Sequence, residues 1–194
     1  MLHLLLMAGL AVTPPDPNCV WDHSTVPGRG VIAIPDANRA SPKDSVTFQA
    51  GGASVKVCYS RPSLKGRSMI GGEAVPYGKI WRTGANEATI IHTSGHLVVA
   101  GIHLDAGDYS LYTVPGEREW EVIVNRAIGQ WGHESTYTDS VRAMEVGRGR
   151  VAVERVATPI EQFTIRAEPS SGGDASLILE WQNSRIAIPF NRMR

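Results

Sequence analysis

Several features are scarce in this chain of 194 residues, which has two cysteines, 7% aromatic residues and no excess of charge of either sign. Two cysteines, Cys19 and Cys58, are too few for a disulfide-dense scaffold or a four-cysteine zinc site. The 19 basic residues balance the 19 acidic ones, and proteins that bind nucleic acid normally carry a basic excess. We therefore expect no nucleic-acid partner, and any anion site must be local.

Long hydrophobic runs are also missing, apart from MLHLLLMAGLAV at residues 1–12. This run is too short to span a bilayer, so no stable membrane span is expected, and it ends sharply at Thr13-Pro14-Pro15. Its length suits the apolar part of a secretory signal, which predicts a secreted or periplasmic protein. An uncleaved anchor, or a buried N-terminal strand or helix, are the alternatives.

The remaining chain divides by composition into two parts. Residues 13–44 are rich in Pro, Gly, Asn and Asp and predict an extended arm. Residues 45–190 show apolar side chains at a period of two, which is the mark of half-buried strands, and no long amphipathic helix. The predicted strands are Val46–Gln49, Ser54–Tyr59, Lys79–Arg82, Ala88–Thr93, Leu97–His103, Asp108–Val114, Trp120–Asn125, Val151–Val156, Gln162–Glu168, Leu177–Trp181 and Arg185–Phe190. The pattern predicts an all-β domain, an antiparallel β-sandwich or flattened barrel, with an extended N-terminal arm.

Short turn sequences separate these strands. Ser94-Gly95, Pro115-Gly116 and Asn183-Ser184 each predict a hairpin connection between the strands on either side. The segment 130–146 alternates poorly, so it is predicted to carry a helical turn or a lid over one end of the sheet. The alternation also predicts the core, in four groups that each share a face: Trp120, Val122 and Val124; Phe163, Ile165 and Ala167; Leu177, Leu179 and Trp181; Ile186, Ile188 and Phe190.

The run from Tyr59 to Glu87 is the best pointer to a site, because cations, aromatics, Gly and Pro alternate along it. Guanidinium groups suit carboxylate, sulfate or phosphate, and aromatic faces suit sugars. The predicted ligand-binding residues are Tyr59, Arg61, Arg67, Tyr77, Trp81, Arg82 and Asn86. The alternative is a structural loop, in which these arginines satisfy loop carbonyls and pair with nearby glutamates.

Complete catalytic signatures are absent. The sequence has no GxSxG elbow, no GxxxxGK[ST] or GxGxxG loop and no HExxH motif, so nucleotide or serine-nucleophile chemistry is not expected. Candidates for a general base are Glu87, His92 and His133, and for Glu87 a capping role towards Arg82 is equally compatible. His92, His103 and His133 lack metal-ligand spacing, so we expect neither a metal nor another cofactor.

Alternation within ASVKVCYS places Val55, Val57 and Tyr59 on one face and Cys58 on the other. Cys58 would then point away from the core, where it could form a disulfide with Cys19. Two unpaired thiols are the alternative, although an oxidising compartment favours the disulfide.

Five stretches of the sequence point to a family. YSRPSLKGR, VPYGKIWRTGANEAT, AGDYSLYTVPGEREWEVIVNR, QWG and LEWQNSRIAIPF closely resemble the uncharacterised bacterial family known as domain of unknown function 2911. The resemblance covers roughly Ser45 to Phe190. It implies an exported or lipoprotein-associated all-β protein and brings no established substrate, reaction or cofactor.

Three hypotheses of function follow. The first is an exported β-sandwich that binds a small polar or anionic ligand, such as a glycan or cell-envelope component, at residues 59–87. The second is a hydrolase or lyase acting on such a ligand with Glu87 or a histidine as base. The third is a structural envelope protein that assembles through exposed strand edges. The oligomeric state stays open.

Overall fold

The computed structural model describes residues 38–128, 130–131 and 134–193. The predicted apolar segment 1–12 and most of the arm 13–44 lie outside these residues. The strands are β1 (Lys43–Ala50), β2 (Ala53–Ser60), β3 (Thr89–Thr93), β4 (Leu97–Val99), β5 (Ile102–Leu104), β6 (Gly107–Val114), β7 (Glu119–Asn125), β8 (Glu145–Pro169) and β9 (Ala175–Arg192). Short helical turns are η3 (Glu134–Thr136), α1 (Asp139–Arg142) and η4 (Ser171–Gly173).

The prediction of an all-β, antiparallel fold is confirmed. The strands form one sheet in the order β1-β2-β3-β6-β7-β8-β9-β4-β5, and every named pair is antiparallel. Strand β1 lies at one end of this order and β5 at the other, so the sheet is not closed into a barrel. No helix in the described part of the chain is long and apolar enough to cross a membrane.

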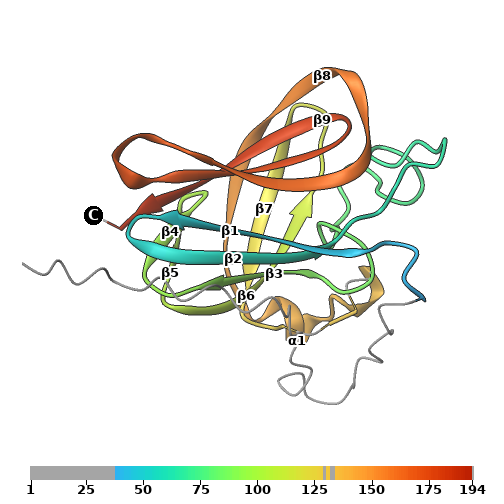
Figure 1. Ribbon diagram of the computed structural model, residues 1–194. Helices are drawn as coiled ribbons and strands as arrows, with labels where there is room; N and C mark the ends of the chain where they lie inside the picture. Colours follow the sequence, from blue (N-terminus) through green and yellow to red (C-terminus); the bar gives the residue numbers. More distant parts are fainter. Residues whose placement is uncertain (1–37, 129, 132–133, 194) are drawn as a thin grey trace, which may run out of the picture.

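Strand β8 turns the single sheet into two layers. Its first part pairs with β7, and from Val153 onwards it pairs with β9. In Figure 1 the β8–β9 ribbon crosses over β1 and β2 as a second layer. Ring contacts join the layers: Phe48 of β1 meets Phe190 of β9, with ring centroids 5.3 Å apart, and Tyr59 of β2 meets Phe163 of β8 at 5.7 Å. The main core therefore lies between the layers.

The predicted core is largely confirmed. All four predicted groups are buried except for Ala167, which is half-buried. A second, smaller cluster lies on the other face of the sheet and contains Ala88, Tyr112, Ile123, Ala127, Tyr137 and Val141. The last of these belongs to α1, so the prediction of a helical turn within 130–146 is also confirmed. This second cluster positions the site described below.

Several strand boundaries were predicted wrongly. Leu97–His103 is not one strand but two, β4 and β5, because Ala100 and Gly101 adopt positive φ angles of 50° and 84° and form a tight hairpin turn. Ser94-Gly95 does not close a hairpin, since β3 pairs with β2 and β6 whereas β4 pairs with β5 and β9. Alternation identifies a strand's buried face but not its partner.

Asn183-Ser184 is likewise not a turn. The two predicted strands around it are one continuous strand, β9, and Val151–Val156 and Gln162–Glu168 are both parts of β8. The register shifts between Arg155 and Ile160, and Gln182 opposite has a positive φ of 54°. Such irregularities bend a strand without ending it. The predicted strand Lys79–Arg82 is reduced to an isolated bridge between Trp81 and Thr113.

Candidate functional site

The run from Tyr59 to Glu87 begins by joining the two layers of the fold. Tyr59 is 1% exposed, and its hydroxyl accepts a hydrogen bond from the Ile165 backbone N–H at 3.0 Å. Burial raises the pKa of Tyr59 to about 12. Arg61 donates from Nε to the Phe163 carbonyl at 3.2 Å and pairs with Asp44 at 3.1 Å. Both predicted ligand contacts are thus engaged within the protein.

The middle of the run is an ordered loop held by its own backbone. Arg67 donates from Nε to the Leu64 carbonyl at 3.0 Å and from Nη2 to the Ser63 carbonyl at 3.1 Å. Tyr77 is half-buried and packs on Gly71, where a Cβ atom would lie 2.6 Å from the tyrosine ring. The arrangement of Arg67 corresponds to the structural alternative, in which arginines satisfy loop carbonyls.

Trp81 lies in the centre of the main core. It is 7% exposed, stacks on Trp181 with ring centroids 5.8 Å apart, and meets Trp120 and Phe163 edge to face. Its indole N–H donates to the Gly84 carbonyl at 3.0 Å. The ring therefore anchors the turn that follows it and has no free face for a ligand.

Residues 83–89 form a rigid turn after Trp81. Thr83 and Asn86 adopt positive φ angles of 56° and 62°. The Thr89 hydroxyl donates to the Thr83 carbonyl at 2.7 Å, and the Thr83 hydroxyl lies 3.1 Å from that of Thr113. Non-glycine residues in the left-handed region indicate backbone strain, and the surrounding hydrogen bonds hold the backbone in this conformation.

Glu87 forms a buried ion pair with Arg39. Nη1 and Nη2 of Arg39 donate to the two carboxylate oxygens at 2.7 and 2.5 Å, and both side chains are 2% exposed. Burial raises the pKa of Glu87, but the hydrogen bonds from Arg39 and the backbone outweigh it, so the net pKa is lowered. Glu87 is therefore a fixed anion with both oxygens occupied.

Arg82 points to the opposite side of the sheet from Trp81, towards the second cluster. Its neighbours on that face include the half-buried Ile80 and the buried Tyr112. Its Nε and Nη1 atoms are buried and have no hydrogen-bond partner among the described residues. Burial lowers the pKa of Arg82, and the attraction of Glu87 opposes this effect. An arginine nevertheless stays charged at neutral pH.

Gln130 is a second polar side chain without partners. It is 4% exposed, and neither its Nε2 nor its Oε1 has a hydrogen-bond partner among the described residues. Its backbone carbonyl accepts a hydrogen bond from the Ala88 N–H at 3.3 Å, next to the bridge between Glu87 and Trp131. Since the Thr89 N–H donates to the Arg82 carbonyl at 3.1 Å, the carbonyls of Gln130 and Arg82 bind the consecutive residues Ala88 and Thr89, where β3 begins.

Two residues of this region were missed by the sequence analysis for different reasons. Arg39 was assigned to the arm, and nothing in the sequence pairs it with Glu87. Gln130 is part of the QWG stretch that carried the family resemblance, so a signal for it was present. Unsatisfied hydrogen bonding, however, becomes visible only in three dimensions.

The histidine candidates do not gather around this region. His92 is part of β3 and places Nδ1 2.6 Å from Asp108 on β6, in a partly exposed pair. His133 lies outside the described residues. Within the described ranges, no group of three or more His, Cys, Asp or Glu side chains could hold a metal ion.

Cys58 points away from the main core, as its alternation with Val55 and Val57 predicts. It is nevertheless only 1% exposed, because it packs with Ile90 in a small cluster of its own. The proposed partner Cys19 lies outside the described residues, so the disulfide stays a prediction.

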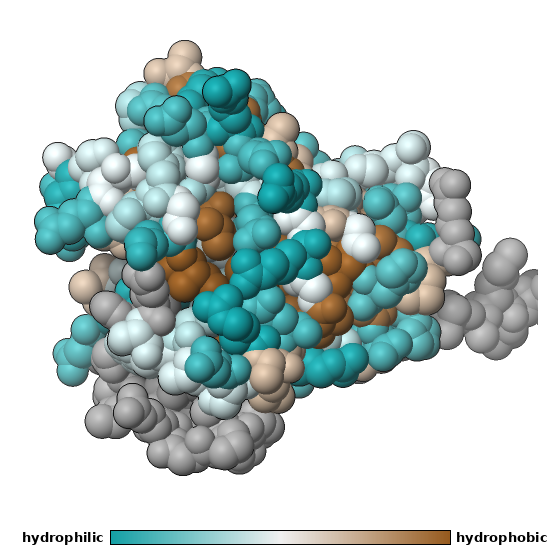
Figure 2. Space-filling view, turned by 180° about the vertical axis from the view of Figure 1, so that it is seen from behind, coloured by the Kyte–Doolittle hydropathy of each residue, from teal (hydrophilic) through white to brown (hydrophobic). Residues whose placement is uncertain are grey.

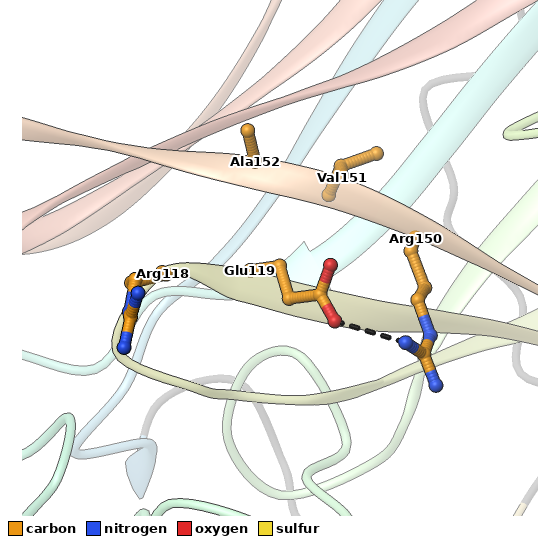
Figure 3. Close-up of a pocket in the computed structure, with 5 residues that line it drawn as sticks. All are labelled: Arg118, Glu119, Arg150, Val151 and Ala152. Atoms are coloured by element: carbon orange, nitrogen blue, oxygen red, sulfur yellow. Dashed lines mark hydrogen bonds and ion pairs between the residues drawn. The ribbon is translucent and has the colours of Figure 1, made fainter.

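Two depressions in the described part of the surface lie away from Arg82 and Gln130. One of about 460 Å³ is shown in Figure 3 and is lined by Arg118, Glu119, Arg150, Val151 and Ala152. Arg150 pairs with Glu119 at 3.0 Å across it. A neighbouring depression has a volume of about 400 Å³. Of the residues that line it, Gly78 is the one that belongs to the run from Tyr59 to Glu87. Both are shallow and carry mixed charge.

The surface itself is polar. Figure 2 shows mainly hydrophilic side chains on one face, with small hydrophobic areas between them. Met144, at 39% exposure, is the one large hydrophobic side chain counted as exposed in the described part of the chain. Large exposed hydrophobic side chains therefore do not cluster in the described part of the chain.

Fold and site together define an antiparallel β-sandwich with a buried cationic centre beside the turn 83–89. The chain belongs to the family described as "Protein of unknown function (DUF2911)", whose sequence profile matches residues 41–190. The family resemblance is thus confirmed, with nearly the predicted extent. Neither curated proteins nor solved structures gave a match.

Proposed function

We propose that this protein is exported and binds a small anionic ligand, such as the carboxylate of a glycan or cell-envelope component, with Arg82 as the main contact. The observation that carries the proposal is that the buried Nε and Nη1 atoms of Arg82 have no hydrogen-bond partner in the part of the chain that the structure describes. A buried donor without an acceptor costs about 1–3 kcal/mol, and more when it is charged. A ligand that supplies acceptors would remove this cost.

The local charge supports an anion. The positive charge of Arg82 lies near Glu87, but both oxygens of that carboxylate already accept hydrogen bonds from Arg39. Burial raises the pKa of Tyr112, so this tyrosine stays neutral and cannot balance Arg82. A bound monoanion would complete the charge balance, and arginine forms strong, directional hydrogen bonds with carboxylate and phosphate.

Binding without chemistry agrees best with the state of Glu87. A general base needs a free oxygen and a pKa near the working pH. Both oxygens of Glu87 are held by Arg39, and its pKa is lowered. Glu87 instead fixes the electrostatic surroundings of Arg82, which is a positioning role.

Export is supported by the sequence alone. The apolar run at residues 1–12 suits a secretory signal, and two cysteines that could form a single disulfide suit an oxidising compartment. Fusing residues 1–44 to a reporter that is active only outside the cytoplasm tests this part. An inactive reporter in bacteria, with the fusion protein present in the cytoplasm, would contradict export.

Ligand binding is tested by a thermal-shift titration with organic acids, sugars, phosphate and sulfate on three proteins. These are the wild type, Arg82→Met and Arg118→Met; the last removes a surface arginine from the depression in Figure 3. We expect one or more of the anions to stabilise the wild type and Arg118→Met in a saturable manner. Arg82→Met should show no such shift.

Either of two outcomes would refute the proposal. One is the absence of a saturable shift with every anion in the wild type. The other is an equal shift in Arg82→Met, which would place the anion elsewhere.

A further inference from the structure

We infer that Gln130 forms the second half of the Arg82 site and that the ligand is a hydroxylated carboxylate, that is, a sugar acid. This inference rests on the proposed anion binding by Arg82 and goes beyond it by defining the rest of the ligand.

The strand register brings the two side chains to one face. Glu87 bridges Trp131 in antiparallel orientation, and the Ala88 N–H binds the Gln130 carbonyl, so Ala88 lies opposite Gln130. Residues directly opposite each other in an antiparallel pair point to the same side. Ala88 belongs to the second cluster, which is also the face that Arg82 occupies.

Arg82 and Gln130 also flank the same short stretch of β-structure. The N–H groups of consecutive residues in a strand point in opposite directions, and here Ala88 donates to Gln130 while Thr89 donates to Arg82. The two side chains therefore rise on either side of Ala88.

The amide of Gln130 specifies both a donor and an acceptor in the ligand. Its Nε2 and Oε1 both lack partners, so this conclusion does not depend on which way the amide is assigned. Buried polar groups are almost always hydrogen-bonded in folded proteins. Gln130 is 4% exposed and has no partner for either amide atom among the described residues, so its amide is suited to a ligand.

A pair of neighbouring hydroxyl groups meets this requirement, because one accepts from Nε2 while the other donates to Oε1. A doubly ionised phosphate monoester has no donor for Oε1. A trans peptide group has both functions, but its N–H and C=O point in opposite directions and cannot face one amide together. Combined with a carboxylate on Arg82, these constraints point to a sugar acid.

The test uses D-glucuronate, cyclohexanecarboxylate and D-glucose as probes, with calorimetric titration of the full chain. Cyclohexanecarboxylate keeps the ring and the carboxylate but lacks every hydroxyl, and glucose lacks the carboxylate. We expect the wild type to bind glucuronate about tenfold more tightly than cyclohexanecarboxylate, because each net hydrogen bond contributes roughly up to a factor of ten. Glucose should bind more weakly than both.

Variants then assign the difference to one residue. Gln130→Met should weaken glucuronate binding about tenfold and leave cyclohexanecarboxylate binding unchanged. Gln49→Met, at an exposed position of the edge strand β1, is the matched control and should change neither. Arg82→Met should abolish binding of both acids.

The outcomes separate the two proposals. Equal affinity for glucuronate and cyclohexanecarboxylate in the wild type would overturn the inference while leaving anion binding by Arg82 intact, and this comparison needs no variant to fold. Equal weakening of both acids by Gln130→Met would also overturn it. Binding of both acids that survives in Arg82→Met would instead refute the proposed function.

Discussion

Replacing Arg82 by methionine should stabilise the ligand-free protein. Methionine keeps an unbranched stem that can pack against the second cluster, and it removes the two buried nitrogen atoms that lack acceptors. Each such atom costs about 1–3 kcal/mol, and the lost attraction to Glu87 offsets part of the gain. We expect the free energy of unfolding to rise by about 1–3 kcal/mol. For a protein of this size, each kcal/mol of added stability raises the midpoint temperature of thermal unfolding by about 2–4 °C.

Denaturant and thermal unfolding of wild type and variant, in a buffer without carboxylate, phosphate or sulfate, measure this difference. Arg61→Met is the matched control, since Arg61 donates to Phe163 and pairs with Asp44. That variant should be destabilised. If Arg82→Met also loses 1 kcal/mol or more, its guanidinium stabilises the fold, and the reasoning that assigns it to a ligand is wrong.

Three further predictions concern the groups that hold the fold together. Tyr59→Phe should lower the free energy of unfolding by about 2 kcal/mol, because the buried Ile165 N–H loses its acceptor. The Tyr59→Phe protein should also lose less stability than the wild type when the pH is raised from about 10 to 12. The raised folded-state pKa of Tyr59 stabilises the wild-type fold only while the tyrosine stays protonated. Glu87→Gln should cost about 3–5 kcal/mol at pH 7, because it removes the negative charge that faces the buried guanidinium of Arg39. Because the pKa of Glu87 is lowered, this carboxylate stabilises the fold above its ordinary pKa, and the stabilisation disappears as the pH falls through the lowered value. The variant should therefore lose less stability in acid than the wild type. Gly149→Ala should destabilise by about 2 kcal/mol or more, since a Cβ would lie 2.1 Å from a backbone carbonyl oxygen.

Urea unfolding across the pH range checks all three. Tyr77→Phe, at a half-buried tyrosine, is the control for Tyr59→Phe and should change stability little. An alkaline profile for Tyr59→Phe identical to that of wild type would contradict the first prediction. If Glu87→Gln lost as much stability in acid as the wild type does, the second prediction would be wrong. A Gly149→Ala protein as stable as the wild type would contradict the third.

Sequence reasoning identified the fold class well because burial repeats along a strand. The alternation in EWEVIV placed Trp120, Val122 and Val124 in the core, and they are buried. It could not assign strand pairing, as at Ser94-Gly95, because any two amphipathic strands present similar faces. It also could not show that β9 continues through Gln182, where a positive φ bends the strand without ending it.

The composition of the run from Tyr59 to Glu87 indicated where a site lies, but only the contacts in the structure show which of its side chains could bind a ligand. Arg61, Arg67 and Arg82 look alike in the sequence, yet the Nε atoms of the first two donate to carbonyls, whereas Nε and Nη1 of Arg82 have no acceptor among the described residues. The difference arises from which side of the sheet each residue faces and which carbonyls lie there. Such information depends on pairing between segments that are distant in the chain.

The most direct test of the central claim is the NMR signal of the Arg82 Nε–H group, assigned by its loss in Arg82→Lys. This N–H has no hydrogen-bond partner among the described residues, whereas the Nε–H of Arg67 already donates to the Leu64 carbonyl. On titration with D-glucuronate we predict a saturable shift of the Arg82 signal and a constant Arg67 signal. An Arg82 signal that does not move while the acid binds would contradict anion binding at this residue.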